Sequence, residues 1–209
     1  MTEAAVSLTT PIADAAILSL HSGDSVLLNG VIVTARDRAH QWLYERFIRQ
    51  SVAPTLDDLI VYDALKPYLN NGLIYHCGPI VAELPDGSYQ FIAAGPTTSI
   101  REEPYQAEII QHFNLKGVIG KGGMGTATLQ ACAQTPAVYF HAVGGAAALI
   151  AQSVIEVLDV YKLEFGMPEA MWVIRVENFP AVVTMDAHNR SLHEQILTRS
   201  KWNLENLLG

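Results

Sequence analysis

The chain has 209 residues, of which 50% are apolar and 16% are charged, so it can bury a sizeable core. Its net charge of −8 argues against a broad surface for nucleic acid or for membrane. No apolar run reaches the roughly 18 residues that a membrane span needs. The first residues lack the basic and apolar regions of a secretory signal, so we expect a cytoplasmic location.

Strand and helix patterns alternate along the first half of the chain. Residues 25–35 predict a hairpin or a strand pair around Asn29-Gly30, a dipeptide typical of tight turns. Residues 36–50 carry apolar side chains at helical spacing, and residues 55–65 predict a shorter helix. Two strands are expected next, at 72–81 and 89–96, joined by a turn with the sequence ELPDGS.

The second half continues the alternation. The predicted elements are a helix at 104–115, a strand at 116–120, a helix at 125–134, a strand at 137–143, a helix over 144–160 that begins at paired glycines, two strands within 171–187, and an amphipathic helix at 191–208. Some connections are hairpins and others are helices. We therefore expect one α/β domain over residues 1–209, with a mixed sheet flanked by helices.

Three cationic side chains follow predicted strands. Arg36 comes after the first strand pair, Arg101 after the strand that ends at Gly-Pro, and Lys121 after a short buried strand. Binding sites of α/β proteins collect at the carboxyl ends of strands. In an acidic chain this repeated placement predicts a local site for a dianion. Arg38, by contrast, is expected to be a solvated arginine of a first helical turn.

The glycine-rich stretch GKGGMG, residues 120–125, follows a predicted strand and precedes a predicted helix. It matches the G-x-G-x-x-G pattern of dinucleotide sites, but the acidic residue expected about 20 positions later is missing, and Lys121 would crowd a pyrophosphate. We interpret the stretch as a loop whose amides and single ammonium group face a small anion. The alternative is a purely structural role, as a flexible strand-to-helix turn.

Other polar residues have structural interpretations. Ser99 and Glu102 fit a capping box before a helix that has Pro104 in its first turn. His76 and His141 are expected to be hydrogen-bonded core residues at strand ends. The two cysteines, Cys77 and Cys132, lie in unrelated surroundings, make no disulfide framework and cannot ligate a four-thiolate cluster by themselves.

Eight short motifs occur in a characteristic order. They are LTTPI, GD-VLLNGVIVTARDRAH, HCGPIV, AAGPTTSIR, GKGGMG, HAVGGAAAL, FGMPEAMWV and FPAVVTMDAH, and they run from about Leu8 to about Leu197. In this order the sequence resembles the β subunit of class I, iron–sulfur fumarate hydratases. It also resembles the L(+)-tartrate dehydratase β subunit and the C-terminal domain of single-chain class I fumarases.

The resemblance implies a swivelling β/β/α fold and a shared active site. It implies that Arg36, Arg101 and Lys121 bind a dicarboxylate substrate and that Thr97 acts as the catalytic base. It also implies a [4Fe–4S] cluster on a partner α subunit, not ligated by this chain, within a hetero-oligomer of the α2β2 type. The three cations are the ones that their positions after strands had already indicated.

One position departs from the family pattern, and the resemblance leaves several functions open. The family commonly has methionine after the arginine of this motif, whereas this chain has Glu102, which either tunes the arginine or points to solvent. The resemblance favours interconversion of fumarate and L-malate, with dehydration of L(+)-tartrate to oxaloacetate as the alternative. A non-catalytic anion-binding regulatory module would not need Thr97, and a nucleotide-binding oxidoreductase would need the missing acidic residue.

Overall fold

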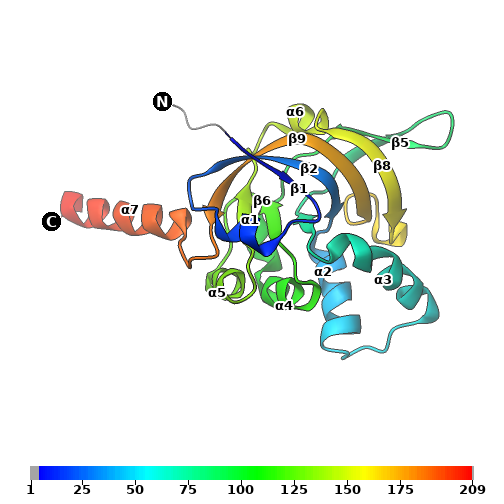
Figure 1. Ribbon diagram of the computed structural model, residues 1–209, viewed down its shortest axis with the longest axis horizontal. Coiled ribbons are helices and arrows are strands. Elements are labelled where there is room, and N and C mark those ends of the chain that lie inside the picture. The colour runs from blue at the N-terminus through cyan, green and yellow to red at the C-terminus, as the bar shows by residue number, and fades with distance from the viewer. Residues whose placement is uncertain (1–4, 209) are drawn as a thin grey trace.

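The structure is a computed structural model that describes residues 5–208 (Figure 1). Its centre is a seven-stranded mixed sheet with the order β1-β2-β3-β6-β7-β9-β8. The strands of this sheet are β1 Val6–Thr9, β2 Ser25–Thr34, β3 Leu73–Tyr75, β6 Gly117–Gly120, β7 Val138–His141, β8 Val154–Tyr161 and β9 Met171–Met185. Strands β1, β2, β3, β6 and β7 are parallel to their neighbours in this group, whereas β9 is antiparallel to β2, β7 and β8.

Strand β9 closes the sheet on itself. One of its edges pairs with β2 and the other pairs with β8 and β7, so β2, β3, β6, β7 and β9 form a ring of strands. A separate hairpin consists of β4 Ile80–Glu83 and β5 Tyr89–Ala93. The mixed sheet flanked by helices confirms the predicted fold class.

The helices cover the sheet on both faces (Figure 1). They are α1 Asp14–Leu18, α2 Asp37–Leu43 with its π-helical extension Tyr44–Ile48, α3 Leu56–Leu69, α4 Glu103–Phe113, α5 Thr126–Gln134, α6 Ala147–Ala151 and α7 Leu192–Leu208, and two 3₁₀ turns lie at Ser99–Glu102 and Leu163–Phe165. Within the part of the chain that the structure describes, no helix is long and apolar enough to cross a membrane.

Alternate residues of the strands face two hydrophobic clusters. Ile32 and Leu73 belong to the cluster beside α1, α6 and the hairpin, whereas Val33 and Ile74 belong to the cluster beneath α2, α3, α4 and α5. Strands buried on both faces are typical of parallel sheets covered by helices. This packing holds the carboxyl ends of β2, β3, β6 and β7 side by side.

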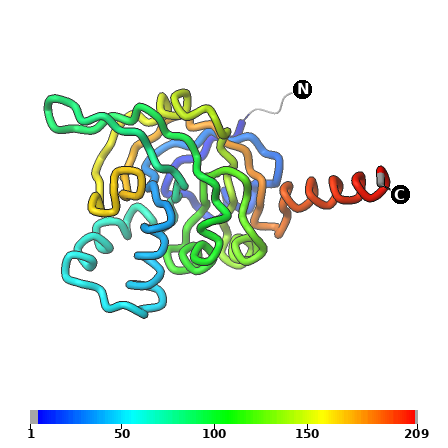
Figure 2. Tube along the Cα trace, turned by 180° about the vertical axis from the view of Figure 1, so that it is seen from behind, coloured from blue at the N-terminus to red at the C-terminus, as the bar shows by residue number. Residues whose placement is uncertain are grey.

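Helix α7 differs from the others because most of it projects away from the sheet (Figure 2). Its large apolar side chains are correspondingly exposed, including Ile196, Trp202 and Leu207. Only its first turn approaches the strands, where His193 Nε2 lies 2.9 Å from Thr184 Oγ1. The prediction of an amphipathic helix at this end of the chain is confirmed.

Several predictions of local structure were wrong. The single strand expected at 72–81 is instead β3 in the main sheet and β4 in the separate hairpin. Residues 25–34 form one strand, not a hairpin, with a bulge at Asn29 and Gly30. Residues 144–160 contain only the short helix α6, and their second half is strand β8. Residues 171–185 form the single long strand β9 instead of two strands.

Candidate active site

The predicted site residues lie at one edge of the sheet. Strands β2, β3, β6 and β7 are neighbours and parallel, so their carboxyl ends meet at that edge. Arg36 is the residue just before α2, two positions after β2 ends, and Lys121 follows β6 directly. The sequence prediction that these two cations follow strands of the sheet is therefore confirmed.

Thr97 reaches the same edge by a different route. The strand before it, β5, belongs to the separate hairpin and not to the main sheet. The chain then crosses the ends of β3 and β6: the Thr97 amide donates to the His76 carbonyl at 2.7 Å, and the Lys121 amide donates to the Thr97 carbonyl at 3.2 Å. The backbone thus places Thr97 directly between two strand ends.

Arg36 is held by its surroundings and keeps one donor unused. Its Nη1 lies 3.3 Å from Glu169 Oε1, and its side chain passes over Gly78. Its Nε is buried without a hydrogen-bond partner among the described residues. Buried polar groups are nearly always hydrogen-bonded, so an orphaned guanidinium nitrogen beside strand ends indicates a place for an acceptor. The sequence carried no signal for the Glu169 contact.

Thr97 shows the same pattern. Its Oγ1 is buried and has no hydrogen-bond partner among residues 5–208. A threonine hydroxyl can donate one hydrogen bond and accept two. At the edge that holds Arg36 and Lys121, this buried hydroxyl therefore has unused hydrogen-bonding capacity towards the described residues.

Arg101 lies in the 3₁₀ turn Ser99–Glu102 and is exposed.

Arg38 is exposed as expected, but it is not free in solvent, because its Nη1 donates to the Phe165 carbonyl at 3.1 Å and its guanidinium lies 5.0 Å from the Phe165 ring centroid.

Glu102 does not point to solvent and does not form the predicted capping box. Its side chain is fully buried, and neither carboxyl oxygen has a hydrogen-bond partner within the described residues. Ser99 Oγ instead contacts His76 Nδ1 at 2.9 Å and the Tyr139 hydroxyl at 2.8 Å. The prediction failed because the Ser-x-x-Glu spacing says nothing of the histidine and tyrosine that the fold brings to Ser99.

A chain of buried side chains runs beneath the site. His40 Nδ1 lies 2.9 Å from the Arg36 carbonyl oxygen, which can only accept, so Nδ1 carries the hydrogen. Burial lowers the pKa of His40, so the ring is neutral and its Nε2 accepts from the side-chain amide of Gln106, 2.9 Å away. The structure records Gln106 Oε1 facing both rings, but Nε2 of a neutral His40 with its hydrogen on Nδ1 can only accept, so we assign the amide the opposite orientation, with its nitrogen towards His40.

The same amide fixes the state of His76. Its Nε2 also lies 2.9 Å from the Gln106 amide and therefore accepts, which leaves the hydrogen on Nδ1, where it donates to Ser99. Burial and the neighbouring His40 lower the pKa of His76 well below its usual value. His76 is thus the hydrogen-bonded, neutral core residue that the sequence predicts.

His141 differs from that expectation. It is only partly buried, and its Nδ1 is buried without a partner within the described residues. Its ring centroid lies 5.9 Å from that of His193, at the start of α7. Sequence analysis did not single out His40, Gln106 or His193, because their positions show no motif and only the fold brings them to the strand ends.

The glycine-rich loop 120–125 is partly different from the prediction. The amides at the start of α5 already have an acceptor within the chain. The Glu103 carboxylate accepts hydrogen bonds from the backbone amides of Gly125, Ala127 and Thr128 at 2.8 to 3.2 Å. A helix N-terminus attracts negative charge, and here the chain supplies it. Lys121 remains at the edge, with its side chain beside Gly144.

The cysteines do not fit an iron–sulfur cluster. Cys77 and Cys132 are buried in the two separate hydrophobic clusters and are free. Burial raises the pKa of each thiol to about 12, which disfavours the thiolate that a cluster requires. Within residues 5–208 no three His, Cys, Asp or Glu side chains gather as metal ligands.

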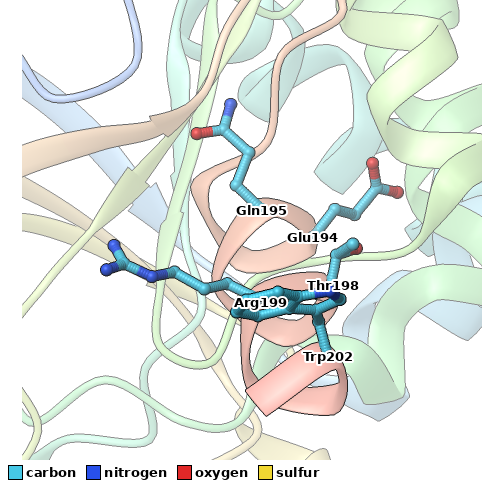
Figure 3. Close-up of a pocket in the computed structure, with 5 residues that line it drawn as sticks. All are labelled: Glu194, Gln195, Thr198, Arg199 and Trp202. Atoms are coloured by element: carbon cyan, nitrogen blue, oxygen red, sulfur yellow. The ribbon is translucent and has the colours of Figure 1, made fainter. Parts of the chain in front are cut away.

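A shallow depression lies elsewhere, on helix α7 (Figure 3). Its lining residues all come from that helix: they are Glu194, Gln195, Thr198, Arg199 and Trp202. None of the residues at the strand ends lines it, so we assign it no part in the site.

Comparison with known proteins gives one consistent result. The family model for the fumarase C-terminus matches residues 1–196. A protein of Geobacillus stearothermophilus, named as a candidate class I fumarate hydratase, is 46% identical over 202 residues, which are 97% of this chain and 35% of that protein. The chain therefore spans about a third of the length of this relative.

Two further relatives are chains of similar length. One from Methanocaldococcus jannaschii, named as a candidate L(+)-tartrate dehydratase subunit beta, is 40% identical over 92% of this chain and 93% of its own length. The L(+)-tartrate dehydratase subunit beta of Escherichia coli K12 is 38% identical over 88% of this chain and 85% of its own length. By these matches the chain belongs to the fumarase C-terminus family, which includes the fumarate hydratase and tartrate dehydratase β subunits.

Proposed function

We propose that this chain is the β subunit of an iron–sulfur hydro-lyase that interconverts fumarate and L-malate. In this proposal an α subunit carries the [4Fe–4S] cluster, and the two subunits share one active site in a hetero-oligomer. The names of the relatives support the reaction class, and the poor fit of Cys77 and Cys132 to a cluster agrees with a cluster on the partner.

One observation carries the proposal. Arg36 Nε and Thr97 Oγ1 are both buried at the edge where Lys121 also lies, and neither has a hydrogen-bond partner among residues 5–208. A dicarboxylate supplies acceptors for the arginine and for the ammonium group, and its reacting carbon can lie beside the hydroxyl. Arginine suits a carboxylate because its planar fork binds two oxygens. We assign substrate binding to Arg36, Arg101 and Lys121.

The chemistry assigned to this chain has two parts, stabilisation of developing negative charge and transfer of a proton. When L-malate loses water, a proton leaves C3 and negative charge spreads onto the adjacent carboxylate. Fixed cations aimed at such developing charge usually make the largest contribution to catalysis. We assign Thr97 Oγ1 as the acceptor of the C3 proton, a role in which the hydroxyl must first have given up its own proton. A hydroxyl is a weak base unless neighbouring groups activate it, so the nearby cations are part of this assignment.

Tartrate dehydration is the second candidate, and a specific observation favours it. The two relatives named for tartrate dehydratase are separate chains of about this length, whereas the relative named for fumarate hydratase is much longer. The higher identity to the fumarate hydratase favours the first candidate. Both reactions remove or add water next to a carboxylate and need the same cations.

The test is a direct assay of the assembled enzyme. The chain is co-expressed with its α subunit, reconstituted anaerobically with iron and sulfide, and supplied with fumarate, L-malate or L(+)-tartrate. We expect fumarate hydration to be the fastest reaction, and we expect the chain alone to be inactive and to bind no stoichiometric cluster. Full activity or a four-iron cluster in the chain alone would end the two-subunit proposal.

A further inference from the structure

Glu102 is a buried acid next to the proposed substrate-binding cations, and the proposed function gives it no role. Its carboxyl group is shielded from solvent and has no hydrogen-bond partner among residues 5–208. Burying a carboxylate without partners is costly, so this environment favours the neutral acid. Burial, followed by the nearby Asp37 carboxylate, raises the pKa of Glu102 to about 8.

The charged and titratable groups around Glu102 come from several elements. They are Asp37 in α2, Arg36 before α2, Arg101 in the same 3₁₀ turn, His76 after β3 and Tyr139 in β7. Tyr139 remains a neutral phenol, because burial raises its pKa beyond the range of ordinary buffers. Asp37 repels a carboxylate at Glu102, so any group that stabilises the ionised form must be Arg36, Arg101 or His76.

His76 cannot supply that attraction. Its Nδ1 lies 4.0 Å from Glu102 Oε2, but the ring is neutral, because burial and the neighbouring His40 lower its pKa well below the usual value. The cations that remain are Arg36 and Arg101, both of which favour the ionised form of Glu102. These are two of the three cations that the proposed function assigns to the dicarboxylate.

We propose that Glu102 is an internal competitor of the dicarboxylate substrate. As a neutral acid it leaves Arg36 and Arg101 to the substrate, and as a carboxylate it takes up their charge and weakens substrate binding. Binding of the substrate and ionisation of Glu102 are then mutually exclusive, so the bound dianion keeps Glu102 protonated. This inference rests on the proposed function for the identity of the substrate, but the competition itself does not require turnover.

The competition has a defined pH dependence. Both carboxyl groups of fumarate and of malate stay ionised above pH 7, so the substrate does not titrate there. With a pKa of about 8, the share of neutral Glu102 falls from about nine-tenths at pH 7 to about one-tenth at pH 9. If only the neutral form binds, the apparent KM rises about tenfold over this interval.

The first experiment measures KM for L-malate between pH 6.5 and 9.5 in the assembled enzyme. Wild type should show the tenfold rise, whereas Glu102→Gln and Glu102→Met, which cannot ionise, should change less than twofold. Met fills a similar volume without a polar group, so it covers the case in which the Gln variant folds poorly. Glu103→Gln is the matched control: it removes one negative charge from the next residue, which caps α5, and should keep the rise.

A merely structural Glu102 predicts a different result. Its substitution would then shift KM by a similar factor at every pH and would leave the slope intact. A Glu102→Gln enzyme that keeps the tenfold rise, or a wild-type enzyme whose KM is flat from pH 7 to 9, overturns the proposal.

The second experiment does not depend on activity. Infrared difference spectra of the complex, wild type minus Glu102→Gln, report the C=O stretch of the protonated Glu102 carboxyl group. We expect the band at pH 7 and its loss near pH 8, and saturating succinate, a dicarboxylate that cannot react, should move the loss to higher pH. A missing band at pH 7, or a midpoint that succinate leaves unchanged, overturns the competition. A complex that turns over no diacid but shows the succinate shift overturns only the proposed function.

Discussion

The side chain of Arg36 lies across Gly78 at a distance that leaves no room for a larger residue. A Cβ atom at position 78 would lie 2.6 Å from Arg36 Nη1 and 3.0 Å from its Cδ, and 2.9 Å from the carbonyl oxygen of Pro168. Real Cβ atoms essentially never come this close to other heavy atoms. The absence of a side chain at Gly78 therefore lets Arg36 lie in this position.

Gly78→Ala should consequently displace Arg36 and weaken substrate binding. Losing one charged hydrogen bond to a carboxylate costs about 1.5–3 kcal/mol, which corresponds to roughly a ten- to hundredfold fall in kcat/KM. Steady-state kinetics of the assembled enzyme with L-malate measure this fall in kcat/KM.

Gly144→Ala provides the control for this prediction. A Cβ at position 144 would lie 3.5 Å from Lys121 Cδ, which is an ordinary contact, so this variant should stay within about twofold of wild type. Equal effects of the two substitutions would show that the close approach of Arg36 to Gly78 does not matter for binding.

Sequence patterns predicted the cations because their signal is local. Arg36 and Lys121 each follow a short apolar run and precede a helix, and this order is visible without knowledge of the fold. The burial of Glu102 was not predictable in the same way. It depends on α2, β3 and β7 surrounding one 3₁₀ turn, and nothing within a few residues of Glu102 indicates that arrangement.

The misread strands have a shared physical cause. Asn29-Gly30 and Asn178 look like turns, but they lie opposite each other in the β2–β9 pair, where Asn29 Oδ1 accepts from the Asn178 amide at 2.9 Å. Gly30 has φ +94° and packs against Thr10, so it forms a bulge and the strand continues. A turn signal becomes a bulge when a distant strand pairs with it.

The predicted helix over residues 144–160 fails at strand β8 for a related reason. Two register shifts, between Val154 and Glu156 and between Val157 and Asp159, break the alternation of its side chains. The remaining apolar spacing fits a helical period nearly as well as a strand. Its edge pairing with β9, which the local pattern cannot reveal, decides in favour of the strand.

Thr97→Ala should lower kcat far more than it raises KM. A general base contributes roughly 10²–10⁴-fold to a rate, and within the described part of the chain Thr97 Oγ1 has no hydrogen-bond partner whose loss would disturb the fold. Thr97→Ser keeps the hydroxyl and should recover most of the activity. Both are measured by initial rates of fumarate hydration, with unfolding curves as a check on structure. If kcat of Thr97→Ala changes less than twofold while KM rises, Thr97 only binds substrate and the proton goes elsewhere.

Arg101→Lys should separate a bidentate grip from simple charge balance. Lysine keeps the charge but lacks the planar fork of arginine. If Arg101 grips a substrate carboxylate, kcat/KM should fall roughly ten- to a hundredfold, in line with the loss of a charged hydrogen bond. If the exposed side chain is only solvated, the effect should stay below about 1 kcal/mol. Assays with both L-malate and L(+)-tartrate decide between these outcomes, since near wild-type rates on each would exclude the grip.

Glu102→Gln should stabilise the chain at high pH and not at low pH. The folded state raises the pKa of Glu102 from 4.5 to about 8, mainly through burial, so the folded chain holds this proton more tightly than the unfolded chain does. The contribution of Glu102 to stability is then fully present below about pH 4.5 and is lost as pH rises through 8. The loss is about 1.4 kcal/mol per pH unit, or up to about 4 kcal/mol between pH 5 and pH 8.

Urea unfolding of wild type and of Glu102→Gln at pH 5, 7 and 9 measures this loss. The amide does not ionise, so the variant should gain on wild type as pH rises to 8 and then keep a constant advantage. Glu205→Gln, the same substitution at an exposed position of α7, should track wild type within about 0.5 kcal/mol at each pH. A difference between Glu102→Gln and wild type that is the same at pH 5 and pH 9 would mean that folding does not shift the Glu102 pKa, because only a shifted group links stability to pH.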